Sequence, residues 1–495
     1  MGISVNGSAT DFALMNSIIV GCGKIGVSEA GAANDVYGTN NLFYGNRVDF
    51  QDEGSVACVG SNAINACAGM SGNRSDRNPG FAKLYDNYNF NAFYSDSPCT
   101  NTGIGGVNLG AYTNPVIVPV SSNTYYVATT GSDTNSKVQA TNSTTPWKSM
   151  TNAIANAVAG DTVIVKPGTY TNSAVVEFNR CGSGQPIRFQ AEGSVVLVKS
   201  GSTPQIKLTA ASDVILDGFE IRGQTFAVGF SYKNIIRNCR FMRVNANGIS
   251  FTGSPGNLVE LCVMASNNVN VAMNDASGNN LFSKCRMLDA TNTAATSGSI
   301  VFGPYSCSNI RLENCVVAGG RNHGIFMSGV AQTVFLVNSV VTGHTLDGVH
   351  VEPGTTTGGG VMLTNCIIFS NGAYGVNEVN TRMDAYPGYC CFSNNASGNF
   401  YDFDSAGGYT TASDINTLVL PVGSTTNNIV VDPLFVNAGT NDFRLLTGSL
   451  CIDAGTPTTE LATAYYGNPR KQGSAVDIGI HEYPVKNNGT LIQVR

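Results

Sequence analysis

A short phrase recurs down the middle of this chain and constrains its fold more than any other feature. The phrase is an apolar residue, often followed by Asn, then Cys or Ser, then further apolar or charged residues. Its marked residues are Cys239, Cys262, Cys285, Cys315, Ser339 and Cys366, separated by 23, 23, 30, 24 and 27 residues. A repeat of this length, made of residues that favour β-strands, is typical of a solenoid.

A second phrase, with Gly or Asn followed by alternating apolar residues, keeps the same period. It occupies residues 247–250, 268–271, 298–301, 323–326, 347–350 and 374–377. The short runs are rich in Val, Ile and Phe, which favours strands over helices. We therefore predict an all-β, right-handed parallel β-helix whose coils stack about 4.8 Å apart.

The stacking of like residues predicts the role of most cysteines. The Cys/Ser column should point inward as small buried hydrophobes, with the adjacent Asn forming a turn ladder. No CxxC pair is present, so zinc binding is not indicated. In the pair Cys390-Cys391, the two side chains should point to opposite faces of a strand, so at most one of them points into the coil.

Composition excludes several classes of partner. Charged residues make up 12% of the 495 residues and the net charge is −6, without a basic block. Nucleic acid and anionic membranes are therefore poor partners. No apolar run reaches the roughly 18 residues needed to span a bilayer, so no membrane span is expected.

The amino-terminal part reads as the end of another β-helix unit. Residues 14–21 resemble residues 336–343, and the text lacks the pattern of a Sec signal peptide. Motifs near residues 78–112 also resemble the carboxyl-terminal motifs. The expected divisions are residues 1–114 (terminal coils and tail of a first unit), 115–123 (linker), 124–431 (β-helix), 432–484 (tail segment) and 485–495 (extension).

Solenoid ends need a cover, because open end strands promote aggregation. Residues 150–158 have a helical pattern, with Ser149 as the N-cap. We expect this helix to cover one end of the main β-helix and the tail segment to cover the other. Trp147 should pack under the first coil.

Two stretches resemble known proteins. The run from Tyr125 through Trp147 to Pro167-Gly168-Thr169-Tyr170 resembles the opening of secreted right-handed parallel β-helix proteins, including relatives of pectate lyases. The tail, Ser449-Leu450-Cys451-Ile452-Asp453-Ala454-Gly455 and Asp477-Ile478-Gly479-Ile480-His481-Glu482-Tyr483, resembles the SxxIDAG and DIGxxEY closing segment of bacterial surface β-helix proteins. The resemblance implies the fold and a sugar ligand, whereas the group's activities include lyases, glycosidases, adhesins and tailspike-like proteins.

The candidate catalytic residues lie on adjacent coils. Three of the four histidines, His323, His344 and His350, fall between residues 321 and 352, near Arg321, Asp347, Glu352, Glu378, Arg382 and Asp384. If Val349 and Val351 point inward, His350 and Glu352 point outward on one strand. Asp347 stands at its entrance, and Glu378 follows one coil later. A His base or a carboxylate pair could act on a glycan. The alternative is that these polar residues point outward only because they are solvated.

Binding and metal candidates complete the prediction. His323, Phe326, His350, Glu352 and Asn377 are the candidate glycan-binding residues. Asp402 and Asp404 are candidate calcium ligands on one side of an extended segment, and no other metal or cofactor is indicated. Asp432, Asp453 and Asp477 beside Gly or Pro are better explained by turns.

Three functions fit the sequence. The first is a rigid surface or virion component (spike, fibre or capsid-associated) that contacts glycans or neighbouring subunits, with homo-oligomers as one arrangement. The second is a secreted polysaccharide lyase or glycoside hydrolase, and the third is a cell-surface adhesin of tandem β-helices. The equivalent outward positions in other coils, Ser250, Val301, Phe326 and Ser328, carry no ionisable group and favour a non-catalytic role. All three place the protein outside the cell, at a cell surface or on a virion.

Overall fold

The computed structural model describes most of the chain from residue 122 onward and separate stretches before it. The described residues are 3–6, 12–20, 25–30, 36–44, 48–52, 56–59, 61–67, 70–75, 122–172, 175–180, 185–199, 206–275, 277–303, 307–328, 333–352, 359–379, 384–418, 425–457 and 463–484.

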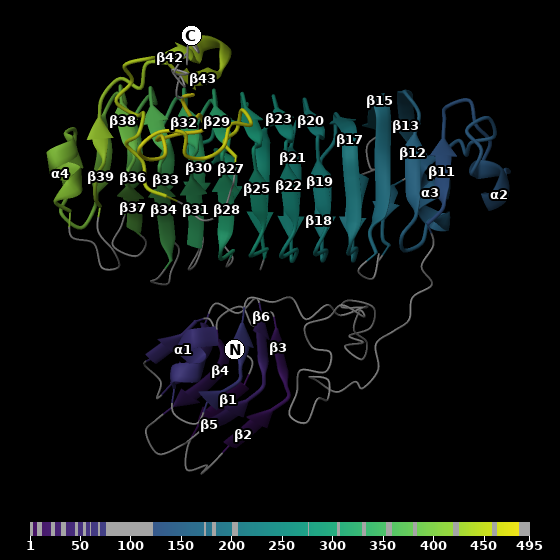
Figure 1. Cartoon of the computed structure of the whole chain (residues 1–495), viewed down its shortest axis with the longest axis horizontal. Helices are drawn as coiled ribbons and strands as arrows, with labels where there is room; N and C mark the ends of the chain where they lie inside the picture. Colours follow the sequence, from purple (N-terminus) through teal and green to yellow (C-terminus); the bar gives the residue numbers. More distant parts are fainter. Residues whose placement is uncertain are drawn as a thin grey trace, which may run out of the picture. The chain divides into compact units, whose positions relative to one another are not determined.

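Two long sheets of stacked strands form the main body (Figure 1). An 11-stranded sheet contains one strand from each coil, joined in parallel until the last, antiparallel pair. In order its strands are β14 (Val176–Phe178), β16 (Ile206–Thr209), β18 (Phe226–Gly229), β21 (Asn247–Thr252), β24 (Val269–Asn274), β27 (Gly298–Phe302), β30 (His323–Met327), β33 (Val349–Val351), β36 (Tyr374–Glu378), β39 (Gly398–Asp402) and β40 (Gly407–Tyr409). The structure thus has the predicted parallel β-helix architecture.

The second sheet has 20 strands, and most coils contribute two strands to it. Its members are β11 (Thr124–Val127), β12 (Thr162–Val165), β13 (Gly168–Asn172), β15 (Ile187–Lys199), β17 (Val214–Arg222), β19 (Ile235–Arg237), β20 (Arg240–Met242), β22 (Leu258–Glu260), β23 (Val263–Ala265), β25 (Leu281–Ser283), β26 (Arg286–Leu288), β28 (Ile310–Glu313), β29 (Val316–Ala318), β31 (Thr333–Val337), β32 (Val340–Thr342), β34 (Gly360–Thr364), β35 (Ile367–Phe369), β37 (Asp384–Gly388), β38 (Cys391–Ser393) and β41 (Ile429–Val430).

The recurring Asn-Cys phrase forms the corner between the two strands of each coil in this sheet. Asn238, Asn314, Asn338 and Asn365 have φ between 49° and 54°, a left-handed conformation that Asn tolerates better than most residues. Leu261 and Tyr389 take the same left-handed conformation at the corresponding corners. The residue after each corner turns inward: Cys239, Cys262, Cys315, Cys366 and Cys390 are at most 1% exposed. The predicted inward Cys/Ser column is confirmed.

Six side chains of this column, those of Cys239, Cys262, Cys315, Ser339, Cys366 and Cys390, also bond to backbone of the preceding coil. The thiol of Cys366 donates to the carbonyl of Leu336 at 3.2 Å, and that of Cys262 donates to Ile236 at 3.4 Å. Ser339 accepts from the backbone N–H of Cys315 at 3.0 Å. A small polar or sulfur atom therefore links one coil to the next at this corner.

Buried asparagines form a second link at another corner. Asn257 accepts hydrogen bonds from the backbone and side-chain nitrogens of Asn234 at 3.1 and 3.0 Å, and donates to the carbonyl of Ser231 at 3.0 Å. Asn280 repeats this pattern toward Asn257. These bonds satisfy corner backbone groups that the sheets leave unpaired.

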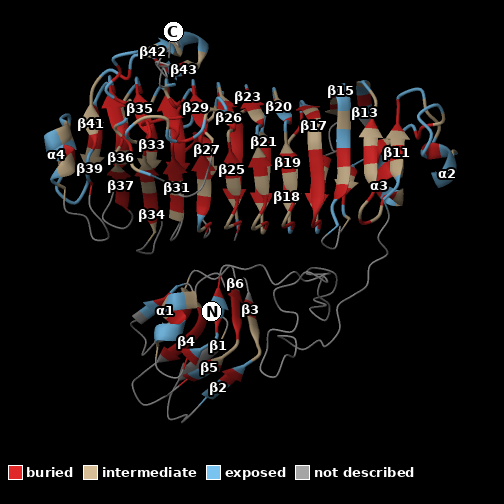
Figure 2. Ribbon diagram, in the orientation of Figure 1, coloured by how far each residue is buried: buried red, intermediate tan, exposed pale blue. Residues whose placement is uncertain are grey.

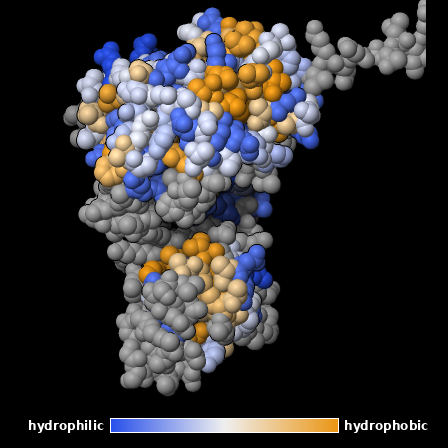
Figure 3. All heavy atoms as spheres, turned by 90° about the vertical axis from the view of Figure 1, so that its left-hand side faces the viewer, coloured by the Kyte–Doolittle hydropathy of each residue, from blue (hydrophilic) through white to orange (hydrophobic). Residues whose placement is uncertain are grey.

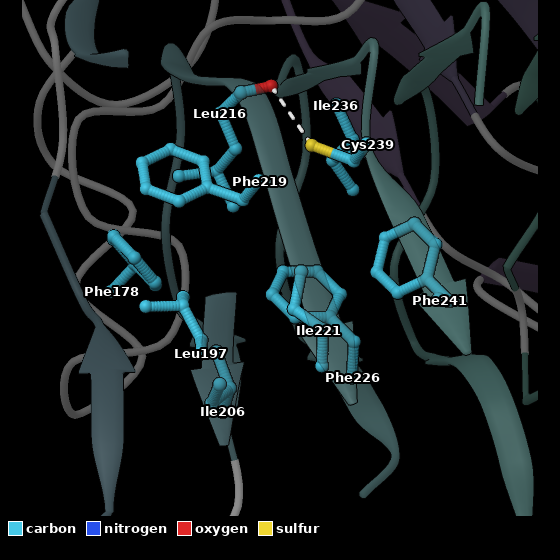
Figure 4. Close-up of a pocket in the computed structure, with 10 residues that line it drawn as sticks. All are labelled: Phe178, Leu197, Ile206, Leu216, Phe219, Ile221, Phe226, Ile236, Cys239 and Phe241. Atoms are coloured by element: carbon cyan, nitrogen blue, oxygen red, sulfur yellow. Dashed lines mark hydrogen bonds between the residues drawn. The ribbon is translucent and has the colours of Figure 1, made fainter. Parts of the chain in front are cut away.

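The interior is filled by apolar side chains, which appear as buried positions along the strands (Figure 2). Figure 4 shows Phe178, Phe219, Phe226 and Phe241 converging with aliphatic side chains beside the Cys239–Leu216 hydrogen bond. The residues drawn there line a small apolar pocket.

The amino-terminal cover of the β-helix agrees with the prediction. Helix α3 (Met150–Asn156) begins after Ser149, whose hydroxyl accepts from the N–H of Asn152. A second short helix, α2 (Lys137–Ala140), was not predicted. Trp147 is 1% exposed, stacks on Tyr125 with ring centroids 4.9 Å apart, and donates to the carbonyl of Asn135.

The carboxyl-terminal tail does not cover the other end, which corrects the sequence prediction. The tail, with β42 (Phe435–Asn437), η2 (Ala438–Thr440) and β43 (Asp442–Leu445), packs over the outer side of β29, β32, β35 and β38. The outward residues of those strands are themselves apolar and need a cover. They form one buried cluster with the tail: Val316, Val340, Ile367, Phe369 and Cys391 with Phe443, Leu445, Cys451, Ile478 and Ile480.

Helix α4 (Ala412–Asn416) lies at the end where the tail was expected (Figure 1). Ile415 of this helix is fully buried, and Asn416 bonds to Asn428. Figure 3 views this end and shows a hydrophobic patch among mostly hydrophilic side chains. Cys391 is buried under the tail while Cys390 points inward, so both faces of that pair are covered.

The described amino-terminal strands form three small sheets that contain none of the strands from β11 onward. Their corners match those of the main body: Asn16 and Asn40 have φ of 50° and 52°, and Asn41 accepts from the N–H of Ser17. The first sheet contains β1 (Ile3–Asn6), β4 (Ile25–Ala30), β7 (Val48–Asp52) and β8 (Val56–Cys58), and the second contains β2 (Phe12–Met15), β5 (Val36–Thr39) and β9 (Met70–Ser71). The third contains β3 (Ile18–Val20), β6 (Leu42–Tyr44) and β10 (Arg74–Ser75). One helix, α1 (Ser61–Ala66), accompanies them. Most of these strands pair in parallel, as in coils of a β-helix, and their assignment to the end of a second unit stays a prediction.

The expected domain boundaries stay predictions. The duplicated tail near residues 78–112, nearly all of the linker and the extension 485–495 lie outside the described residues. The chain separates into two compact units that divide within the main β-helix. They are Met1–Leu281 with Phe302–Ile310 and Gly329–Gln332, and Phe282–Val301 with Arg311–Ser328 and Thr333–Arg495.

The Asn ladder predicts a stability difference between two asparagine variants. Asn257→Ala should lower the free energy of unfolding by about 3 kcal/mol, because the carbonyl of Ser231 and the N–H of Asn234 lose their partner in a buried corner. Asn245→Ala, at an exposed position, should change it by less than about 0.5 kcal/mol. Urea unfolding followed by circular dichroism measures both; equal midpoints would contradict the ladder's role.

Candidate functional site

The outer face of β33 carries the residues that the sequence singled out. Val349 and Val351 are fully buried and point inward, whereas His350 and the following Glu352 are partly exposed on the other side. This is the alternation that the sequence predicted. The site therefore lies on the outside of the 11-stranded sheet, within the second compact unit.

Asp347 holds His350 through a short hydrogen bond. The ring nitrogen Nδ1 of His350 lies 2.7 Å from Oδ2 of Asp347, which is 2% exposed. The same carboxylate accepts from the side-chain nitrogen of Asn377 at 2.9 Å and from the backbone N–H of Tyr374 at 2.8 Å. Asn377 reaches it because β33 and β36 pair with His350 opposite Asn377.

These bonds decide the charge of Asp347. Burial alone would raise its pKa, but hydrogen bonds from His350, Asn377 and the Tyr374 backbone outweigh burial and hold the pKa well below its ordinary value. The carboxylate therefore stays ionised and accepts a hydrogen bond from the Nδ1–H group of His350. In the described part of the chain, Nε2 of His350 has no hydrogen-bond partner, and its imidazole is 13% exposed.

His323 supports this pair rather than extending it. Its Nε2 lies 2.9 Å from the carbonyl of Ala295, to which it donates, and its Nδ1 accepts from the backbone N–H of Asp347 at 3.2 Å. The His323 ring lies 4.1 Å from the His350 ring, and Phe326 stacks on His350 at 5.4 Å with 10° between planes. The two rings fix the orientation of His350.

His344 does not belong to the site, although the sequence grouped it with the other two histidines. It is 2% exposed, and its Nδ1 accepts from the N–H of Gly320 at 3.1 Å while its Nε2 donates to the carbonyl of Val317 at 3.2 Å. Asn395 makes the same pair of bonds to backbone of the preceding coil. His344 is thus a member of a corner ladder, and burial lowers its pKa to about 4.

Glu378 does not join the outer face, which corrects its grouping with His350. Its register partner is the inward-pointing Val351. Glu378 is 2% exposed and accepts from the N–H of Ala385. Burial, with the nearby carboxylates of Asp402, Asp384 and Asp404, raises its pKa to about 9, so it is protonated at neutral pH. Among the described residues, Glu352 has no paired carboxylate on its face of β33.

Asp402 ends strand β39 and Asp404 lies in the turn of residues 403–406, so the two do not share one extended segment as expected. The carboxylate of Asp402 accepts from the N–H of Asp404 at 2.9 Å and from the hydroxyl of Ser405 at 2.5 Å. Its oxygens serve that turn, and the calcium site stays a prediction. Arg382 lies outside the described residues.

One group of side chains has the composition of a transition-metal site. The ligand atoms of His323, Asp347 and His350 all lie within 4.8 Å of one another. However, Nδ1 of His323 accepts a backbone N–H and Nδ1 of His350 is bonded to the carboxylate. A metal ion would have to displace both bonds. The arrangement fits an Asp–His pair better than a metal centre.

Comparison with known proteins agrees with this architecture. Residues 198–358 match the family model of the right-handed β-helix region. No curated protein matches the sequence. This match covers less than half of the chain and agrees with the right-handed parallel β-helix fold of the structure. Within the described residues, no helix is long and apolar enough to cross a membrane.

Solved structures show the same fold at low identity. Pectate lyase Pel9A aligns with a TM-score of 0.52 and 19% identity over 73% of this chain and 97% of that chain. A rhamnogalacturonan lyase aligns with a TM-score of 0.40 and 15% identity over 64% of this chain and 91% of that chain. An alginate lyase from Paenibacillus sp. str. FPU-7 aligns with a TM-score of 0.40 and 16% identity over 53% of this chain and 96% of that chain. Only the first TM-score exceeds 0.5, and it bears on the fold alone.

The buried His344 predicts a pH dependence of stability. Its folded-state pKa of about 4 lies below the unfolded value of about 6.5, so the unfolded chain binds the proton first as the pH falls. The stability present above pH 6.5 should be lost progressively down to about pH 4, at about 1.4 kcal/mol per pH unit. His344→Asn should remove this contribution, which urea unfolding between these pH values measures. Parallel stability curves for the two proteins would contradict it.

Proposed function

We propose that this β-helix binds an acidic polysaccharide along the outer face of the 11-stranded sheet and cleaves it by β-elimination. The observation that carries the proposal is the 2.7 Å hydrogen bond from His350 to the ionised Asp347, which leaves Nε2 of His350 on the outer face. Histidine is suited to general-base work near neutral pH, and a buried carboxylate partner fixes its tautomer.

The chemistry follows from that geometry. Nε2 of His350 removes the proton on the carbon next to the uronate carboxyl group. The electron pair of that C–H bond forms a carbon–carbon double bond and expels the glycosidic oxygen, which takes a proton from the imidazolium or from water. Asp347 stabilises the imidazolium that forms, because its charge lies 2.7 Å from Nδ1. The products are a saturated end and an unsaturated sugar.

Neighbouring residues supply contacts to the glycan. Asn377 uses its amide nitrogen on Asp347, so its carbonyl oxygen can accept a sugar hydroxyl. Glu352 lies on the same face two residues after His350. Arg321 is exposed two residues before His323 and offers a cation for a uronate carboxylate. Arg321 suits an acidic glycan, whereas the Glu352 carboxylate can serve only as an acceptor for a sugar hydroxyl.

The lyase reading is supported better than the other readings from the sequence. The fold similarity to a pectate lyase is an analogy at the level of fold, and the Asp–His pair adds a specific chemical reason. A glycosidase needs two carboxylates across the cleaved bond, and Glu378 faces the interior. The surface or virion component and the adhesin stay predictions. A polysaccharide substrate would place the protein outside the cytoplasm.

The Asp–His pair predicts a loss of cleavage in two variants. His350→Ala and Asp347→Asn should each lower kcat/KM by roughly 10²- to 10⁴-fold, because general-base catalysis contributes about that much. The assay follows the ultraviolet absorbance of the unsaturated product on polygalacturonate, alginate and other uronic-acid polysaccharides. Ser250→Ala, at a partly exposed position on β21 of the same sheet, is the matched control and should behave like the parent protein.

Two results would overturn the lyase proposal. One is the absence of product from every polysaccharide in the panel, with the parent protein folded by circular dichroism. The other is cleavage that survives in both His350→Ala and Asp347→Asn. Release of reducing ends without ultraviolet absorbance would indicate hydrolysis instead, and Glu352→Gln would then be the variant to measure.

A further inference from the structure

An aromatic surface lies beside the Asp–His pair, and neither the catalytic chemistry nor the core accounts for it. Tyr374 and Tyr401 are both partly exposed, and their ring centroids lie 5.3 Å apart with 49° between planes. Phe403, two residues after Tyr401, is 43% exposed. Large exposed aromatic side chains commonly mark binding surfaces.

Strand register places this surface in line with the catalytic residues. His350 pairs with Asn377 across β33 and β36, and Asn377 pairs with Tyr401 across β36 and β39. Tyr401 therefore lies two strands beyond His350 in one outward column, at about 10 Å for a strand spacing of about 4.8 Å. Tyr374 is linked to the pair directly, because its backbone N–H donates to Asp347.

Glycines keep the two rings uncovered. Gly408 pairs with Tyr401 across the antiparallel strands β39 and β40. A Cβ atom at Gly408 would lie 3.3 Å from the hydroxyl of Tyr374 and 3.8 Å from the ring of Tyr401. A Cβ atom at Gly398 would lie 3.1 Å from the Tyr374 ring. Any larger side chain at these positions would fill the space over the rings.

The turn that follows Tyr401 is also held in place. Asp402 accepts from Ser405, and the hydroxyl groups of Ser405 and Tyr409 lie 2.6 Å apart. Phe400 precedes Tyr401, and it pairs with Val376, two residues after Tyr374, across β39 and β36. Both Phe400 and Val376 are fully buried. The core under this surface is therefore complete without Tyr374 and Tyr401.

We propose that Tyr374 and Tyr401 form a sugar-binding subsite about two sugar residues from the bond that is cleaved. The inference rests on the proposed function and adds a location and a chemistry to it. The ligand is a pyranose ring of the same glycan chain, whose C–H face packs on the aromatic rings while its hydroxyls reach the tyrosine oxygens. The strand spacing is close to the length of one sugar residue, so a chain lying across the strands meets both places.

The test separates binding from cleavage. Tyr401→Ala and Tyr374→Ala should each raise KM for the cleaved polysaccharide roughly tenfold. In Tyr401→Ala kcat should be about unchanged, because the lost contact is made equally before and during the reaction. Tyr401→Phe keeps the ring and should retain most of the affinity. Tyr126→Ala, a partly exposed tyrosine on β11, is the matched control. Electrophoresis in gels that contain polygalacturonate or alginate measures binding independently, and circular dichroism checks that each variant is folded.

Each outcome decides the matter. Cleavage with an unchanged KM and unchanged gel retardation in both alanine variants overturns the subsite and leaves the proposed lyase intact. Retardation of the parent protein that is lost in Tyr401→Ala but kept in Tyr401→Phe supports the subsite, even if no polysaccharide is cleaved. If neither cleavage nor retardation occurs with either polysaccharide, both the subsite and the proposed function fail.

Discussion

The structure depends on the hydrogen bonds that join each coil to the next at the corners. Along the strands, parallel pairing satisfies the backbone, but at the corners the chain turns and its N–H and C=O groups lose those partners. Asn234, Asn257 and Asn280 replace them at one corner, and the Cys/Ser column donates to carbonyls of the preceding coil at another. The residue before each inward Cys or Ser is left-handed and makes the sharp turn. Asn adopts this conformation at little steric cost, whereas Leu261, Lys284 and Tyr389 adopt it against a steric penalty. Because these corners keep the coils in register, an outward side chain on one strand has a defined neighbour on the next.

The candidate site is a consequence of that register. His350, Asn377 and Tyr401 come from three consecutive coils, separated by 27 and 24 residues in sequence, and lie in one column. Asp347 stands at a corner, where a buried carboxylate can accept backbone and side-chain donors from two coils at once. Those donors keep it ionised despite its burial, and an ionised Asp347 fixes the Nδ1 proton of His350. The same corner geometry therefore serves stability in the ladders and chemistry in the Asp–His pair.

The tail shows how the surface of the β-helix is divided. Strands β29, β32 and β35 carry apolar residues on both faces, and the tail covers the outer one with Phe443, Leu445 and Ile478. The 11-stranded sheet instead carries the imidazole, amide and phenol groups of the proposed site. One outer side therefore contributes to folding, and another carries the groups suited to recognition. A histidine illustrates the same division: His344 in a corner ladder is neutral and structural, whereas His350 on the outer face has a nitrogen directed to the surface.

The sequence by itself determined the coil length, the inward Cys/Ser column, the outward direction of His350 and the helix after Ser149, because each follows from local periodicity or capping. It did not determine which polar residues meet. Because coil lengths vary, the register between neighbouring coils is uncertain by one residue from sequence alone. A shift of one residue exchanges the two faces of a strand, and Glu378 therefore lies on the inner face although the sequence analysis grouped it with the outer one. Tyr374 and Tyr401 carried no motif that would have marked them. The bonds of Asp347, the burial of His344 and the position of the tail depend on contacts between coils far apart in sequence, and only the tertiary structure decided them.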